Sequence, residues 1–142
     1  MEGRQIILNV VAIFSLLLQA CGGKEPTKQD VIGTWKSIDG AIFILKKDGT
    51  FTEKSFPIEF VFQLQPGFKD VRFDGSGKWE LKKENSYWEV YLDFEQVSNE
   101  KCRSAFPLLI SGENGILENK PPWYLFVWKG EEGGDRYKFI KK

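Results

Sequence analysis

Histidine is absent from this sequence, so the side chains able to do acid–base or metal chemistry are carboxylates, lysines, arginines and two cysteines. Without histidine the chain lacks the commonest general base near neutral pH and the commonest metal ligand. A carboxylate-only calcium loop needs several acidic ligands at short spacing around a glycine. Asp70, Asp74 and Glu80 do not have that spacing. We therefore expect no metal and no cofactor.

Carboxylates remain as candidates for catalysis, because two acids facing each other across a cleft can hydrolyse a glycoside without histidine. Glu89, Asp93 and Glu95 share one face of a predicted strand, which is typical of solvated sheet surface. The stretch Gly75-Ser76-Gly77 lacks the lysine and the following helix of a phosphate-binding loop, and predicts a hairpin turn. These patterns indicate a protein that is not an enzyme.

Cys21 follows a strongly apolar N-terminal segment. The apolar run from Ile6 to Leu18 is 13 residues long, whereas a membrane-spanning helix needs about 20, so the segment is predicted to be a cleaved signal peptide. The residues Leu18-Gln19-Ala20-Cys21 resemble a bacterial lipobox, with an aliphatic residue three positions before the cysteine and a small residue directly before it. The resemblance implies that Cys21 receives a diacylglyceryl group and becomes the new N-terminus, with palmitate-type acylation. An ordinary cleaved signal with an incidental cysteine is the alternative.

The predicted organisation has three parts. Residues 1–20 form the lipoprotein signal peptide, residues 21–30 form the lipidated cysteine and a tether, and residues 31–142 form one domain. Two acyl chains supply the two hydrophobic signals that stable anchoring needs. We therefore expect the cell envelope as location, with the membrane contacted through the lipid on Cys21. The residue directly after the lipidated cysteine is Gly22 and not an aspartate. If the host is Gram-negative, this favours the outer membrane over retention at the inner membrane.

The composition of the chain limits the kinds of partner and the disulfide bonds that we expect. The formal net charge is zero, and removing residues 1–20 takes away one base and one acid. This balance argues against nucleic acid as a partner. Lipidation of Cys21 leaves Cys102 alone, so we expect no internal disulfide and a partly buried Cys102. Aromatic residues are frequent, with 12 Phe, 5 Trp and 4 Tyr, which suits a small filled core or a lined cavity.

Short alternating segments separated by turns follow the tether, and they predict an all-β fold. Asp39-Gly40 and Lys47-Asp48-Gly49-Thr50 suit hairpin turns. Thr27 to Asp30 predicts one capped turn. Because the connections are short, the strands should pair antiparallel as an up-and-down meander of about eight strands closing into a barrel. The predicted strands cover residues 31–38, 41–46, a segment starting at 51, 57–65, 68–73, 78–82, 88–95, 105–110, 115–118, 123–128 and 136–140.

Three short motifs resemble those of the small lipocalin-like domains of bacterial lipoproteins. They are Gly33-Thr34-Trp35 on the first predicted strand, the hairpin ending at Phe51, and Gly77-Lys78-Trp79. The resemblance implies a lipocalin-like barrel in which Trp35 closes one end, with a basic side chain from the last strand, Arg136, against its indole. No helix follows the last strand, in contrast to lipocalins.

Two functions follow from this reading. In the first, the barrel binds a small apolar or amphipathic ligand in its interior. In the second, the core is filled and the chain is an envelope protein-interaction module acting through its outer surface. The loop from Asn119 to Trp123, together with Tyr87 and Tyr91, favours the second function. The residues expected to line the interior are Phe60, Phe62, Trp79, Trp88, Val90, Leu92, Trp123 and Leu125.

Overall fold

The computed structural model describes residues 23–60, 71–114, 119–130 and 134–142. Residues 1–20, Cys21 and Phe62 therefore lie outside the described residues. In the part of the chain that is described, no helix has the length and apolarity that crossing a membrane would require.

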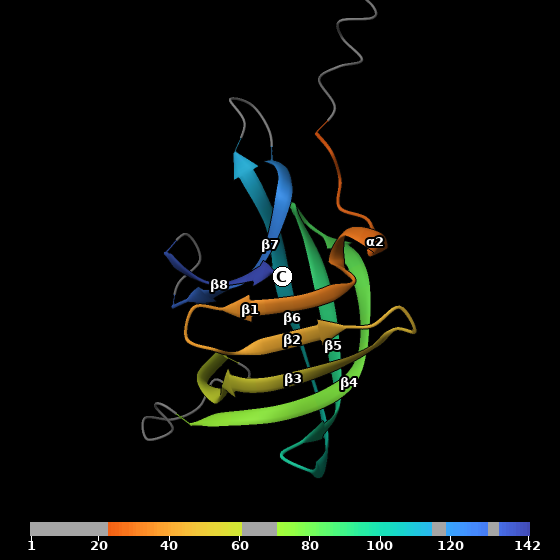
Figure 1. Cartoon of the computed structure of the whole chain (residues 1–142), viewed down its shortest axis with the longest axis vertical. Coiled ribbons are helices and arrows are strands. Elements are labelled where there is room, and N and C mark those ends of the chain that lie inside the picture. The colour runs from red at the N-terminus through yellow and green to blue at the C-terminus, as the bar shows by residue number, and fades with distance from the viewer. Residues whose placement is uncertain (1–22, 61–70, 115–118, 131–133) are drawn as a thin grey trace, which may run out of the picture.

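Eight antiparallel strands close into one barrel in which each strand pairs with the next along the chain (Figure 1). The barrel closes where β1 pairs with β8, with Trp35 opposite Lys141. The predicted up-and-down barrel of eight strands is confirmed. The elements are α2 (Lys28–Val31), β1 (Gly33–Ser37), β2 (Ile42–Leu45), β3 (Thr50–Pro57), a 3₁₀ helix (Ile58–Phe60), β4 (Arg72–Glu84), β5 (Tyr87–Val97), β6 (Glu100–Asn114), β7 (Asn119–Lys129) and β8 (Asp135–Lys141).

The short helix α2 lies at the end of the barrel where the N-terminal tether arrives (Figure 1). The Thr27 hydroxyl accepts from the backbone N–H of Asp30, and the Asp30 carboxylate accepts from the backbone N–H of Thr27, which is a capping box. The helix ends at Val31, whose carbonyl accepts a 2.7 Å hydrogen bond from Trp35 Nε1. The predicted single capped turn is confirmed, and it joins the tether to the first strand.

The interior of the barrel is filled by aromatic and aliphatic side chains from alternate positions of the strands. Phe56 lies at its centre, and Phe51 packs edge-on against Phe94 at 5.0 Å between ring centroids. Interlocked rings of this kind exclude water and add to the stabilisation from burial alone. The rings around Phe56 are Phe43 at 5.2 Å, Phe106 at 5.5 Å, Phe139 at 5.8 Å and Phe73 at 5.9 Å.

Two of the local structures expected between residues 57 and 77 are wrong. Residues 58–60 form a 3₁₀ helix where a strand was predicted over 57–65. The turn expected over residues 74–77 is instead the first part of β4. A Cβ on Gly75 would lie 2.7 Å from the Phe94 ring, and one on Gly77 would lie 2.0 Å from the Asp93 carbonyl oxygen. Gly75 therefore leaves room for the Phe94 ring, and Gly77 leaves room for the backbone of the neighbouring strand. Neither glycine reverses the chain.

The prediction of a loop from Asn119 to Trp123 is also wrong. Asn119 to Pro122 form the start of β7. The backbone of this segment pairs with β6, with Lys120 opposite Glu113. Trp123 consequently follows the alternation of the strand, and its side chain is buried.

Candidate functional site

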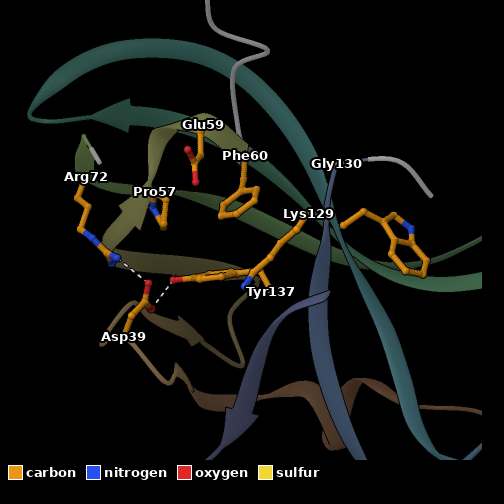
Figure 2. Close-up of a pocket in the computed structure, with 9 residues that line it drawn as sticks. Asp39, Pro57, Glu59, Phe60, Arg72, Lys129, Gly130 and Tyr137 are labelled. Atoms are coloured by element: carbon orange, nitrogen blue, oxygen red, sulfur yellow. Dashed lines mark hydrogen bonds and ion pairs between the residues drawn. The ribbon is translucent and has the colours of Figure 1, made fainter. Parts of the chain in front are cut away.

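An open depression of about 740 Å³ lies at one mouth of the barrel. It lies where β1, β3 and β7 end and where β4 and β8 begin. Because hairpins alternate between the two ends of a meander, this mouth is opposite the end that receives the tether and α2. Figure 2 shows its main lining residues, which are Asp39, Pro57, Glu59, Phe60, Arg72, Lys129 and Tyr137.

A polar network centred on Asp39 forms one wall of the mouth (Figure 2). The Tyr137 hydroxyl donates to Asp39 Oδ1 at 2.5 Å, and Arg72 donates to Asp39 Oδ2 at 2.5 Å. The Ser37 hydroxyl, which is itself buried, also donates to Asp39. Arg72 reaches the backbone carbonyl of Ser55 at 2.8 Å with its second amino group. The network therefore ties the β1–β2 connection to β3, β4 and β8.

The pKa values of both acidic groups in the network, the Asp39 carboxyl and the Tyr137 hydroxyl, are shifted. Burial opposes ionisation of Asp39, but the hydrogen bonds from Ser37, Tyr137 and Arg72 together outweigh it and hold the pKa of Asp39 well below its usual range. Burial raises the pKa of the Tyr137 hydroxyl to about 12, and its hydrogen bond to the Asp39 carboxylate acts in the same direction. At neutral pH the wall therefore consists of a carboxylate, a guanidinium and a neutral phenol.

Aromatic rings form the floor and the second wall. The Phe60 ring lies 4.9 Å from the Tyr137 ring, and Phe56 lies 6.0 Å from Phe60 at the top of the core. Lys129 Nζ lies 5.9 Å from the centre of the Tyr137 ring. Among the described residues, no ion pair involves Lys129 or Glu59. The mouth therefore offers apolar surface together with an ammonium group and a carboxylate.

This arrangement presents groups that can bind a ligand. The oxygen and nitrogen atoms of the Asp39 network hold one another. Within the ranges that the structure describes, no group of three or more acidic or cysteine residues is placed to hold a metal ion. An aromatic shelf with a few polar groups at its rim is typical of ligand pockets.

The predicted interior residues fall into three places. Phe60 lines the mouth. Trp88 and Trp123 line a second cavity at the tether end. Buried in the core are Trp79, Val90, Leu92 and Leu125. The sequence pattern identified the inward face correctly for most of these residues, but it did not separate core positions from those at the two ends.

Trp35 is fully buried at the tether end of the barrel. The prediction that Arg136 packs against its indole is wrong. Lys141 Nζ lies 5.7 Å from the centre of the Trp35 ring and donates to the Asp30 carbonyl. Arg136 lies on the outer face of the barrel, 4.5 Å from the Phe126 ring. Strand register decides this, because β1 pairs with the last residues of β8, which places Lys141 opposite Trp35.

Glu53 is a buried carboxyl group that sequence reasoning missed. Its side chain is 1% exposed and lies on the inner face of β3. Oε1 accepts a 2.8 Å hydrogen bond from the backbone N–H of Phe56, and Oε2 has no partner within the part of the chain that the structure describes. Burial raises the pKa of Glu53 to about 8, and the nearby negative charge of Asp74 adds to the shift. The available signal was its place in the alternation Phe51, Glu53, which puts an acid on the core face.

No protein-family model, curated protein or solved structure matches this chain. Function therefore has to be argued from the geometry of the site, because a barrel fold hosts many functions.

Proposed function

We propose that this chain is a lipid-anchored envelope protein that binds a small amphipathic ligand at the mouth of its barrel and is not an enzyme. The observation that carries the proposal is the pairing of a filled interior with an open, aromatic-floored mouth. A ligand of drug-like size needs a pocket of roughly 300–1,000 Å³, and the mouth, at about 740 Å³, is within that range.

The position of the tether supports this function. The tether reaches the barrel beside α2, and Glu25 of the tether forms an ion pair with Lys83 at the same end. With an anchor on Cys21, this end of the barrel faces the membrane. The mouth at Asp39 and Tyr137 then points away from the lipid, where a ligand or its carrier can reach it.

The chemistry of the mouth defines the ligand class. The Phe60 and Tyr137 rings, inclined at 31° to each other, present an apolar surface, and Lys129 provides a positive charge beside it. An anionic group on a ligand gains binding energy from a charge-assisted contact with such a cation. We therefore expect an apolar body carrying an anionic group.

The anchor is tested with an alkyne analogue of palmitate fed to cells that express the whole chain. We expect label on the wild type and on Cys102→Ser, and none on Cys21→Ser. Cys102 is the matched control, because it is the only other cysteine. Label on Cys21→Ser, or an unlabelled wild type, would contradict lipidation at this position.

Binding at the mouth is tested with anilinonaphthalene sulfonate, an anionic aromatic probe whose fluorescence rises in apolar surroundings. All described helices and strands lie between Lys28 and Lys141, so a chain of residues 22–142 carries the whole barrel and its core. We expect saturable binding that Lys129→Gln weakens about fivefold to tenfold, within the range for a charge-assisted contact. The exposed Lys54→Gln is the control. Equal affinity for both variants would refute the mouth as the site.

A second candidate function is a protein-interaction role through the outer face of β7. Tyr124 and Trp128 are partly exposed on this face and flank the fully buried Phe126. The Arg136 guanidinium lies 4.9 Å from the Trp128 ring and donates to the Tyr124 hydroxyl. Aromatic residues with arginine are the commonest anchors of protein interfaces. A photo-reactive amino acid at position 128 should form one discrete cross-link in cells, and none at the exposed Lys47. Equal labelling at both positions would contradict the role.

A further inference from the structure

A second cavity, of about 300 Å³, lies at the tether end of the barrel, opposite the mouth. Its walls come from Trp88, Ile110 and Trp123, together with Lys83 at the end of β4. Tether residues 23–26 line it as well. This cavity is therefore separate from the mouth and adjoins the segment that carries the expected anchor.

Trp123, which lines this cavity, contains a buried hydrogen-bond donor. The residue is 8% exposed, and the described part of the chain supplies no acceptor for its Nε1. Gly112 allows the ring this position, since a Cβ on that residue would lie 3.0 Å from Trp123 Cε3. A buried donor without a partner is costly, so an acceptor brought to this nitrogen would be favoured.

Lys83 brings a positive charge whose present partner is easily exchanged. Its Nζ lies 2.6 Å from Glu25 of the tether and 5.5 Å from the centre of the Trp88 ring. Both members of the ion pair are about half exposed, and exposed ion pairs contribute little to stability. The tether can therefore be displaced from Lys83 at small cost.

We propose that the tether-end cavity binds a single acyl chain, with the hydrocarbon against Trp88 and Ile110. The carbonyl oxygens of the chain accept from Trp123 Nε1 and lie beside Lys83, replacing Glu25. The volume of about 300 Å³ is at the lower end of the range of roughly 300–1,000 Å³ for small-ligand pockets. It therefore suits a single chain of medium length.

Decanoate is the probe, and the protein is the 22–142 chain labelled with 5-fluorotryptophan, its five fluorine resonances assigned by single replacement with phenylalanine. Saturable shifts of Trp88 and Trp123 are expected, with Trp35 and Trp128 unmoved. Shifts confined to Trp128, or no saturable shift at all, would overturn the proposal. Decanol, which lacks the carboxylate, should bind about tenfold more weakly, since each factor of ten is about 1.4 kcal/mol.

Two variants separate binding from folding. Trp123→Phe removes the N–H and keeps an aromatic ring, and Lys83→Gln removes the charge. Each should weaken decanoate about tenfold while the melting temperature stays within a few degrees of the wild type. Lys54→Gln, an exposed lysine elsewhere on the barrel, should bind as the wild type does. Undiminished affinity in both Trp123→Phe and Lys83→Gln would refute the site.

The acyl chain has two sources, a free fatty acid or the anchor on Cys21, two residues before Gly23. The intact lipidated chain distinguishes them. If the anchor fills the cavity, the Trp123 resonance already has its bound position and decanoate does not move it. If a free fatty acid is the ligand, decanoate moves this resonance as in the 22–142 chain.

Discussion

Replacing Glu53 with glutamine should stabilise the protein at neutral and alkaline pH. Glutamine has nearly the same shape and can still accept the hydrogen bond from the Phe56 backbone N–H through its amide oxygen. It removes the ability to ionise, and its amide NH₂ takes the place of the Oε2 hydroxyl of the protonated acid, which also has no partner among the described residues. The carboxyl is buried, and Oε2 has no partner among the described residues, so its charged form is strongly disfavoured there.

The size of the effect follows from the shift of the Glu53 pKa. The pKa rises from an ordinary value of 4.5 to about 8 on folding, and each unit corresponds to 1.36 kcal/mol. Below pH 4.5 both states hold the proton and the group has no effect. Between pH 4.5 and 8 only the unfolded chain releases it, so the free energy of unfolding falls as the pH rises. The total loss by pH 8 is roughly 3 to 5 kcal/mol.

The assay is urea denaturation of the 22–142 chain between pH 4 and pH 9, followed by tryptophan fluorescence. The stability difference between Glu53→Gln and the wild type should be near zero at pH 4 and grow to several kcal/mol at pH 8 to 9. Burial also raises the pKa of Glu89, but this contribution is common to both proteins and cancels in the difference. The exposed Glu100→Gln is the control and should show no such trend. A difference that stays constant with pH would refute the buried, protonated Glu53.

Two further predictions concern the mouth and β4. Asp39→Asn removes the charge that holds Arg72 and Tyr137, so the pKa of Tyr137 should fall from about 12 toward its ordinary value in an ultraviolet titration. An unchanged tyrosine titration would contradict the Asp39–Tyr137 hydrogen bond. Gly77→Ala places a Cβ 2.0 Å from the Asp93 carbonyl oxygen and should cost about 2 to 4 kcal/mol in denaturation, as overpacking against backbone does. Ser76→Ala, its neighbour, is the control, and equal stability of the two variants would show that the strands separate freely.

The barrel was predictable because its signals are local. Alternation with a period of two, and turn residues such as Asp39-Gly40, determine strand faces and hairpins without knowledge of distant contacts. Trp79 and Leu92 were placed inward on this basis and are buried. The same rule misread Asp74 to Gly77, because glycine serves a turn and a close strand approach equally well.

The site at the mouth was less predictable because its residues are far apart in the sequence and are brought together only when the barrel closes. Asp39 and Arg72 are 33 positions apart, and Tyr137 is 98 from Asp39. Nothing in the local pattern of any of them indicates the others. The prediction of Arg136 as the partner of Trp35 failed for a similar reason, since the register of β1 with β8 places Lys141 opposite Trp35.

The central claim, that ligand binds at the mouth of a filled barrel, is tested most directly by two-dimensional NMR of the isotope-labelled 22–142 chain titrated with anilinonaphthalene sulfonate. We expect saturable shifts at Phe60, Lys129 and Tyr137, with no change at the core residues Leu92 and Leu125. Shifts at these core residues with none at the mouth would place the ligand inside the barrel and refute binding at the mouth.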